Sequence, residues 1–181
     1  MIKFIALLWI GNLRYKWSNW RHRNSIKESS ETNRSWMPKT IRDIAVWVFW
    51  MEGKFKYTYD NWTMLWDSMN TPAACLDIAL NASPLRDDCD GFHAAIMEGL
   101  NNIEGCEVQL LTYVTKPIKY SHTVAVAKLQ DKYLLIDYDK IEDFASLEGV
   151  LAHVARFNNI VAYEFSQHNP AKGWHTGWKI N

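Results

Sequence analysis

The stretch SHTVAVAKLQDKYLLIDY, residues 121–138, determines how the second half of this chain folds. Each of its two arms has the two-residue period that is typical of a β-strand with one buried face. The segment LQDK between the arms is short enough to form a tight turn. The stretch therefore predicts a pair of antiparallel strands, with the beginning of the first strand near the end of the second.

Segments on both sides of this strand pair also have periodic patterns. CEVQLLTYV at residues 106–114 and NIVAYEF at residues 159–165 have the period of strands. SLEGVLAHVARF at residues 146–157 has the spacing of a helix. The final segment, SQHNPAKGWHTGWKIN at residues 166–181, shows neither period, and we interpret it as an irregular tail.

Three helices are predicted upstream of the strands. Apolar residues at helical spacing indicate a helix over residues 41–50, with Gly53 placed to end it. A second helix is expected in TPAACLDIALN, where Thr71 can serve as the N-cap. A third is expected from Asp88 to about Asn101. The apolar stripes expected to be buried are Ile41, Ile44, Ala45, Val48 and Phe49 in the first helix, and Phe92, Ile96, Met97 and Leu100 in the third.

The order of these elements predicts the fold class. Helices first and antiparallel strands afterwards are typical of an α+β fold, in which helices pack against one sheet. A length of 181 residues suits a single domain. We expect an aromatic-rich helical region at residues 1–54, a core at residues 55–165 and the tail at residues 166–181.

Charge and cysteine usage narrow the class of function. Twenty basic residues balance twenty acidic ones, so composition gives no indication of a nucleic-acid partner. Three cysteines without close pairing favour a reducing compartment, and we expect a cytoplasmic protein. The apolar run near the N-terminus is too short to span a bilayer as a helix, so no transmembrane segment is predicted.

Tryptophan is abundant, with ten residues, several of them in the first fifty positions. Trp17 and Trp20 stand among basic residues, where burial of both rings would remove several charges from water. We expect at least one of them to be exposed, on a surface that contacts a substrate or partner. Trp47, beside Ile44 and Val48 on a helical pattern, is expected to pack inward.

The segment SPLRDDCDGF, residues 83–92, surrounds Cys89 with aspartates at the predicted start of the third helix. The first turn of a helix carries unpaired N–H groups and partial positive charge, which stabilise an anion. A thiol there can become a nucleophilic thiolate, and Asp87 or Asp88 can cap the helix. A strong candidate nucleophile also needs a base.

A base and an acid lie in the strand pair. His122 occurs early in the first strand and Asp137 ends the second, so the turn at LQDK brings them roughly opposite each other. A carboxylate in that place can orient an imidazole, which then serves the thiol. Asp139 shares the parity of Asp137, but we expect it to lie beyond the strand end.

The motifs DDCDGF, YSHTVAV and LLIDYDK, in this order, resemble the transglutaminase-like cysteine protease superfamily over about residues 55–140. The resemblance implies a papain-like core, with Cys89 as nucleophile, His122 as general base and acid, and Asp137 as orienting carboxylate. It also implies an upstream contribution to an oxyanion hole or substrate contact. The candidates for that contribution are Tyr59, Asn61 and Trp62, with His93 as a further lining residue one turn after the cysteine.

Two functions remain open at this level. The first is a thiol-dependent amide hydrolase or acyl transferase that acts on a protein or peptide without a cofactor. The second is an inactive module of the same fold that binds or inhibits a partner through its tryptophan-rich surface. A zinc site is disfavoured because the cysteines and histidines lack ligand spacing, and the aspartates around Cys89 lack that of a calcium loop.

Overall fold

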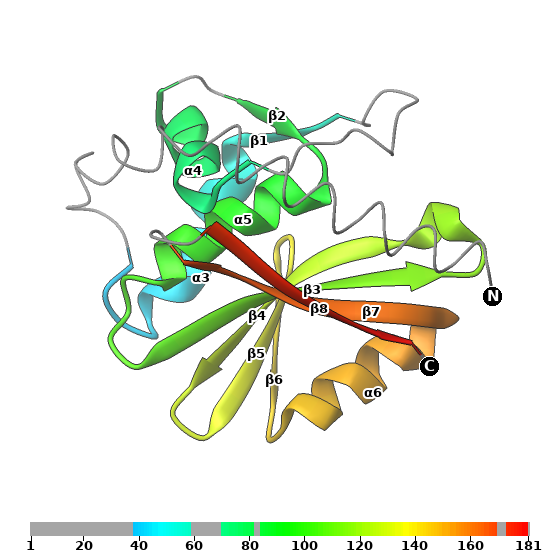
Figure 1. Cartoon of the computed structure of the whole chain (residues 1–181). Coiled ribbons are helices and arrows are strands. Elements are labelled where there is room, and N and C mark those ends of the chain that lie inside the picture. The colour runs from blue at the N-terminus through cyan, green and yellow to red at the C-terminus, as the bar shows by residue number, and fades with distance from the viewer. Residues whose placement is uncertain (1–37, 59–69, 82–83, 170–172, 181) are drawn as a thin grey trace.

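The computed structural model describes residues 38–58, 70–81, 84–169 and 173–180 (Figure 1). The chain has an α+β fold, as its sequence predicts. Tyr59, Asn61 and Trp62 lie outside the described residues, and so do Trp17 and Trp20.

The fold is organised by a six-stranded sheet in the order β6-β5-β4-β3-β7-β8. Every neighbouring pair in it is antiparallel. A separate parallel pair joins β1 (Phe55–Tyr57) to β2 (Leu85–Asp87). The strands of the large sheet are β3 (Cys106–Thr115), β4 (His122–Leu129), β5 (Lys132–Asp137), β6 (Lys140–Phe144), β7 (Ile160–Asn169) and β8 (Gly173–Ile180).

Helices cover the two faces of the sheet unequally (Figure 1). The helix α5 (Cys89–Leu100) packs on β3 and β4, and both α3 (Asp43–Gly53) and α4 (Pro72–Asn81) pack on α5. The helix α6 (Leu147–Phe157) lies on the opposite face, near β5 and β6. Two apolar clusters result. One contains Phe92, Ile96, Met97 and Leu100 of α5, and the other contains Val124, Val126, Leu135, Val150 and Val154 beneath α6.

Local capping explains where two of these helices begin. The Thr71 hydroxyl accepts a hydrogen bond from the Ala74 N–H at 3.2 Å, as an N-cap does. Asp88 caps α5, which resolves the choice between Asp87 and Asp88. Both caps were expected from the sequence.

The predicted irregular tail is wrong. Residues 166–169 extend β7, and β8 pairs with β7 from Asn169↔Gly173 to Ala162↔Ile180. Trp174 of β8 is buried in the cluster on the α5 face. Polar residues and glycine obscure the two-residue period in this edge hairpin, so its pairing rather than its pattern makes it a strand. The sequence also gave no signal for β6, whose charged residues suit the edge of a sheet.

The buried stripe predicted for the first helix is only partly correct. Ile44 and Val48 are buried, and Trp47 packs inward as expected. Ile41 precedes the helix and is exposed, and both Ala45 and Phe49 are exposed on it. The helix is apolar on nearly every side, so hydrophobic spacing alone could not select the buried face. In the part of the chain that the structure describes, no helix is long and apolar enough to cross a membrane.

Candidate active site

Cys89 is the first residue of α5 and is half-buried. The Asp88 side chain accepts the Asp90 N–H at 3.0 Å, and the Asp87 side chain accepts the Asp88 N–H at 3.0 Å. Among the described residues, nothing accepts a hydrogen bond from the N–H of Cys89 itself. The two aspartates thus occupy the N–H groups of Asp88 and Asp90, and the Cys89 N–H between them is left to bind an anion.

Gly91 allows the aspartates to approach the helix this closely. A Cβ atom at position 91 would overlap the Asp87 carboxylate and would lie 2.7 Å from its Cβ atom. The absence of a side chain at Gly91 therefore leaves the space that the Asp87 side chain occupies.

His122 and Asp137 are directly hydrogen-bonded. The imidazole Nε2 of His122 lies 2.8 Å from Oδ1 of Asp137, and the two side chains are 21% and 39% exposed. This bond occupies Nε2 and leaves Nδ1 as the ring nitrogen available to the thiol. Cys89 lies close enough to His122 to influence the pKa of that imidazole, so the structure brings Cys89, His122 and Asp137 together.

The register by which His122 and Asp137 meet differs from the predicted one. The β4–β5 ladder runs from Leu129↔Lys132 to Ala125↔Ile136, and its continuation would set His122 opposite Asp139. The ladder ends before that point, because Tyr138 has φ 52° and turns the chain into β6. Asp139 is exposed in the turn, whereas Asp137 reaches His122 diagonally.

The site favours a charged imidazole. Burial lowers the pKa of His122, but the hydrogen bond to Asp137 and the charges of Cys89 and Asp137 outweigh burial and raise that pKa to about 10. Burial raises the pKa of Asp137, yet the hydrogen bond and charge of His122 outweigh it and leave that pKa below its usual value. A cation beside a sulfur favours the thiolate, which is the nucleophilic form.

Aromatic rings enclose the imidazole. Tyr138 stacks on His122 with centroids 5.6 Å apart, and Tyr113 meets it edge-on at 6.0 Å. Burial and the nearby charges of Asp137 and Cys89 raise the pKa of both tyrosines, so they remain neutral phenols. The sequence analysis missed both residues. The available signals were the position of Tyr138 directly after the strand-end aspartate and that of Tyr113 in the neighbouring strand.

His93 has a different place from the one considered for it. Its side chain is completely buried, with Nδ1 2.6 Å from the Cys89 carbonyl oxygen and Nε2 3.2 Å from the Tyr138 N–H. Burial, followed by the charge of His122, lowers its pKa to about 3. The ring is fully buried, has both nitrogens engaged and lines neither of the two pockets that include His122 and Asp137.

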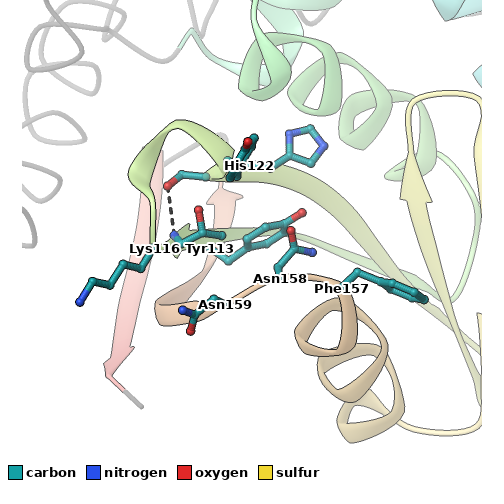
Figure 2. Close-up of a pocket in the computed structure, with 9 residues that line it drawn as sticks. Tyr113, Lys116, His122, Phe157, Asn158 and Asn159 are labelled. Atoms are coloured by element: carbon teal, nitrogen blue, oxygen red, sulfur yellow. Dashed lines mark hydrogen bonds between the residues drawn. The ribbon is translucent and has the colours of Figure 1, made fainter.

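An open pocket of about 500 Å³ adjoins the imidazole (Figure 2). Figure 2 shows His122 on one side of it, with Asn158 and Asn159 on the other. A second pocket of about 350 Å³ includes Asp137 and shares Tyr113, Phe157 and Asn158 with the first. Solvent-sized molecules therefore have access to both His122 and Asp137. The residues that line the first pocket are Tyr113, Thr115, Lys116, Tyr120, Ser121, His122, Phe157, Asn158 and Asn159.

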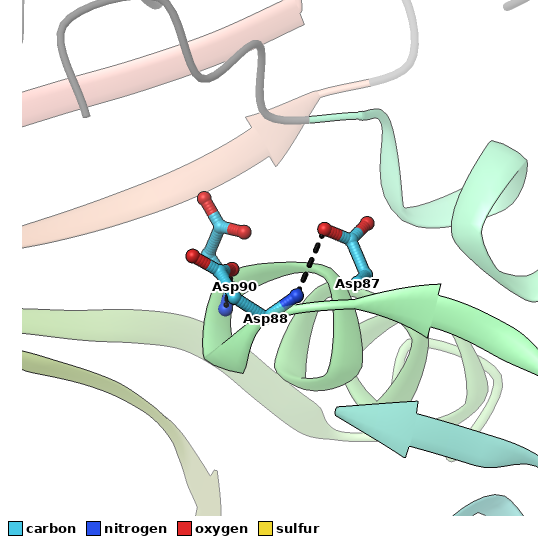
Figure 3. Close-up of side chains that lie close together, drawn as sticks. All are labelled: Asp87, Asp88 and Asp90. Atoms are coloured by element: carbon cyan, nitrogen blue, oxygen red, sulfur yellow. Dashed lines mark hydrogen bonds between the residues drawn. The ribbon is translucent and has the colours of Figure 1, made fainter. Parts of the chain in front are cut away.

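The aspartates before and after Cys89 form the one group of possible metal ligands found among the described residues. Oxygen atoms of Asp87, Asp88 and Asp90 lie within 4.8 Å of one another (Figure 3). Two of these carboxylates already accept backbone N–H groups, which accounts for their position at the helix start.

Comparison of the whole chain with protein-family models and with curated proteins gives no match. The geometry around Cys89 and His122 is therefore the basis for a functional proposal.

Proposed function

We propose that this protein is a thiol-dependent amide hydrolase or acyl transferase with a papain-like, transglutaminase-like arrangement of Cys89, His122 and Asp137. One observation carries the proposal. The imidazole that hydrogen-bonds Asp137 at 2.8 Å also lies close to Cys89, the first residue of α5, whose charge helps to raise the pKa of the imidazole. Nucleophile, base and orienting acid in this order are the elements of a cysteine triad.

In the proposed first step, the Cys89 thiolate attacks the carbonyl carbon of an amide and forms a carbon–sulfur bond. The carbonyl electron pair moves to oxygen, where the Cys89 N–H can donate to the oxyanion. The imidazolium of His122 gives its Nδ1 proton to the amide nitrogen as the carbon–nitrogen bond breaks. The products are a thioester on Cys89 and a free amine.

In the second step, neutral His122 takes a proton from an incoming nucleophile, which attacks the thioester carbon. The carbon–sulfur bond then breaks, and its electron pair stays on the Cys89 sulfur. Water yields a carboxylic acid and makes the protein a peptidase or amidase. A second amine yields a new amide and makes it a transglutaminase. Either route restores the thiolate and the imidazolium, so neither requires a cofactor.

The substrate we propose is a protein or peptide. The pockets beside His122 and Asp137 are open, and the lining of the first combines aromatic, amide and hydroxyl groups. Side chains of this kind can contact both the backbone and the apolar side chains of a polypeptide.

The test begins with iodoacetamide labelling at neutral pH, with peptide mass spectrometry to assign each modified cysteine. We expect Cys89 to react much faster than Cys106, whose pKa is raised to about 11 by burial and then by the charge of Glu107. His122→Ala should abolish that advantage. A screen with peptide, isopeptide and amine substrates should then show turnover that Cys89→Ala removes without a change in melting temperature. Turnover that survives Cys89→Ala would contradict the proposal.

A further inference from the structure

His93 connects the two parts of the site that lie farthest apart in sequence. Its ring is fully buried and contacts the first residue of α5 through one nitrogen and the β5–β6 turn through the other. That turn contains Tyr138, the residue directly after Asp137. The same ring therefore touches the backbone of the proposed nucleophile and the backbone beside the proposed orienting acid.

The chemistry of these partners fixes the tautomer. The Cys89 carbonyl can only accept a hydrogen bond, so Nδ1 of His93 must carry the proton in their 2.6 Å contact. The Tyr138 N–H can only donate, so Nε2 must be unprotonated in their 3.2 Å contact. The neutral Nδ1–H ring satisfies both partners, and a second proton would break one contact.

Surrounding residues hold this ring in place. Phe92 meets it edge-on at 5.0 Å, and the Tyr138 ring packs on it at 5.2 Å. His122 approaches it edge-on at 5.8 Å, so His93 also supports the imidazole that it does not hydrogen-bond. A polar ring is costly to bury unless its hydrogen bonds are made, and here both are made to backbone groups of the site.

We propose that His93 is a positioning residue, which holds the Cys89 thiol at the His122–Asp137 pair by joining the start of α5 to the turn at Tyr138. This inference rests on the proposed function, because it assigns His93 a role in thiol chemistry. His93 itself touches neither the substrate nor the reacting atoms.

Three substitutions of His93 test its Nδ1 and Nε2 hydrogen bonds separately and together. His93→Asn retains a donor near the position of Nδ1, and His93→Gln retains an acceptor near the position of Nε2. His93→Leu removes both. Met97→Ala is the matched control, because Met97 lies one turn further along α5, is equally buried and belongs to the apolar cluster rather than to the site.

The measurement is the rate constant for iodoacetamide alkylation of Cys89 between pH 5 and 9, in the full chain with Cys106→Ser as background. In the parent chain we expect alkylation at pH 6 to be faster than in His122→Ala, because the proposed triad places an imidazolium beside the thiol. His93→Leu should lower the rate at pH 6 by more than about tenfold and shift the profile towards that of an ordinary thiol. The Asn and Gln variants should fall between these limits, and they carry the test if the Leu variant does not fold.

Met97→Ala should lower the melting temperature and leave the alkylation profile unchanged. A folded His93→Leu variant with the parent profile would overturn the positioning role while leaving the proposed function intact. An ordinary thiol profile in the parent chain, unaffected by His122→Ala, would overturn the proposed function and the role of His93 together.

Discussion

Two ion pairs join neighbouring strands of the same sheet, with nearly the same length but different exposure to water. His122 and Asp137 are 2.8 Å apart, and Lys132 and Asp143 are 2.7 Å apart. Both are diagonal pairs, because the ladder sets Leu134 rather than Lys132 opposite Asp143. Distance and strand geometry therefore do not distinguish them.

The two ion pairs differ in how far water reaches them. The side chains of His122 and Asp137 are 21% and 39% exposed, whereas those of Lys132 and Asp143 are 67% and 62% exposed. Water screens the exposed pair, which makes its contribution to stability small. Around the first pair, aromatic rings pack on the imidazole and reduce its contact with water, and the thiol of Cys89 lies nearby. The contrast indicates that enclosure, more than contact distance, distinguishes the pair that we propose for catalysis from the exposed pair.

The largest effect is expected from Asp137→Asn. The amide cannot balance an imidazolium and favours the wrong tautomer of His122, so kcat should fall by roughly 10²–10⁴ while KM changes little. Steady-state kinetics on a substrate from the screen would measure this. Asp139→Asn is the matched control, since Asp139 is exposed in the turn. A greater loss of kcat in the Asp139 variant would mean that Asp139, rather than Asp137, orients His122.

The enclosed pair should also give a pH-dependent contribution to folding. The folded-state pKa of His122, about 10, exceeds the ordinary value of 6.5. Its contribution to stability is therefore fully present below pH 6.5 and is lost as pH rises towards 10. We expect the difference in unfolding free energy between the parent chain and His122→Gln to shrink steadily over this range. Urea titrations at pH 6, 7.5 and 9 would measure it, and a constant difference would contradict it.

Removal of one enclosing ring should produce an intermediate effect. Asn tolerates positive φ, so Tyr138→Asn removes the stacked ring while the turn at φ 52° is retained. An aromatic contact contributes about 0.5–1.5 kcal/mol, so the alkylation rate of Cys89 should fall by up to about tenfold. Tyr138→Phe retains the ring and should resemble the parent chain. Equal losses in the Phe and Asn variants would mean that the hydroxyl, rather than the enclosure, matters.

The smallest effect is expected from Lys132→Ala. Its ion pair is exposed, so the melting temperature and the reactivity of Cys89 should both equal those of the parent chain within error. Differential scanning calorimetry at low and at high salt would check this. A marked loss of stability would show that the two pairs are more alike than their exposure indicates.

Sequence reasoning was most successful where neighbours along the chain decide the structure. The two-residue period of residues 121–138 gave two strands, and the cap at Asp88 gave the start of α5. It failed for β8, where pairing with β7 rather than an apolar period makes the strand. It also failed for Phe49, because a helix that is apolar on most sides does not reveal which side is buried.

Local sequence patterns were enough to predict the residue types at the site: a thiol at a helix start, an imidazole at the beginning of one strand and a carboxylate at the end of the next. These follow from local periodicity and capping, which depend on residues a few positions apart. The folded arrangement of the strands was needed to show that Asp137 reaches His122 diagonally, because the turn at Tyr138 ends the ladder early. It also decided that His93 faces backbone rather than substrate, since its contact with Tyr138 spans 45 residues and forms only when α5 packs on the sheet.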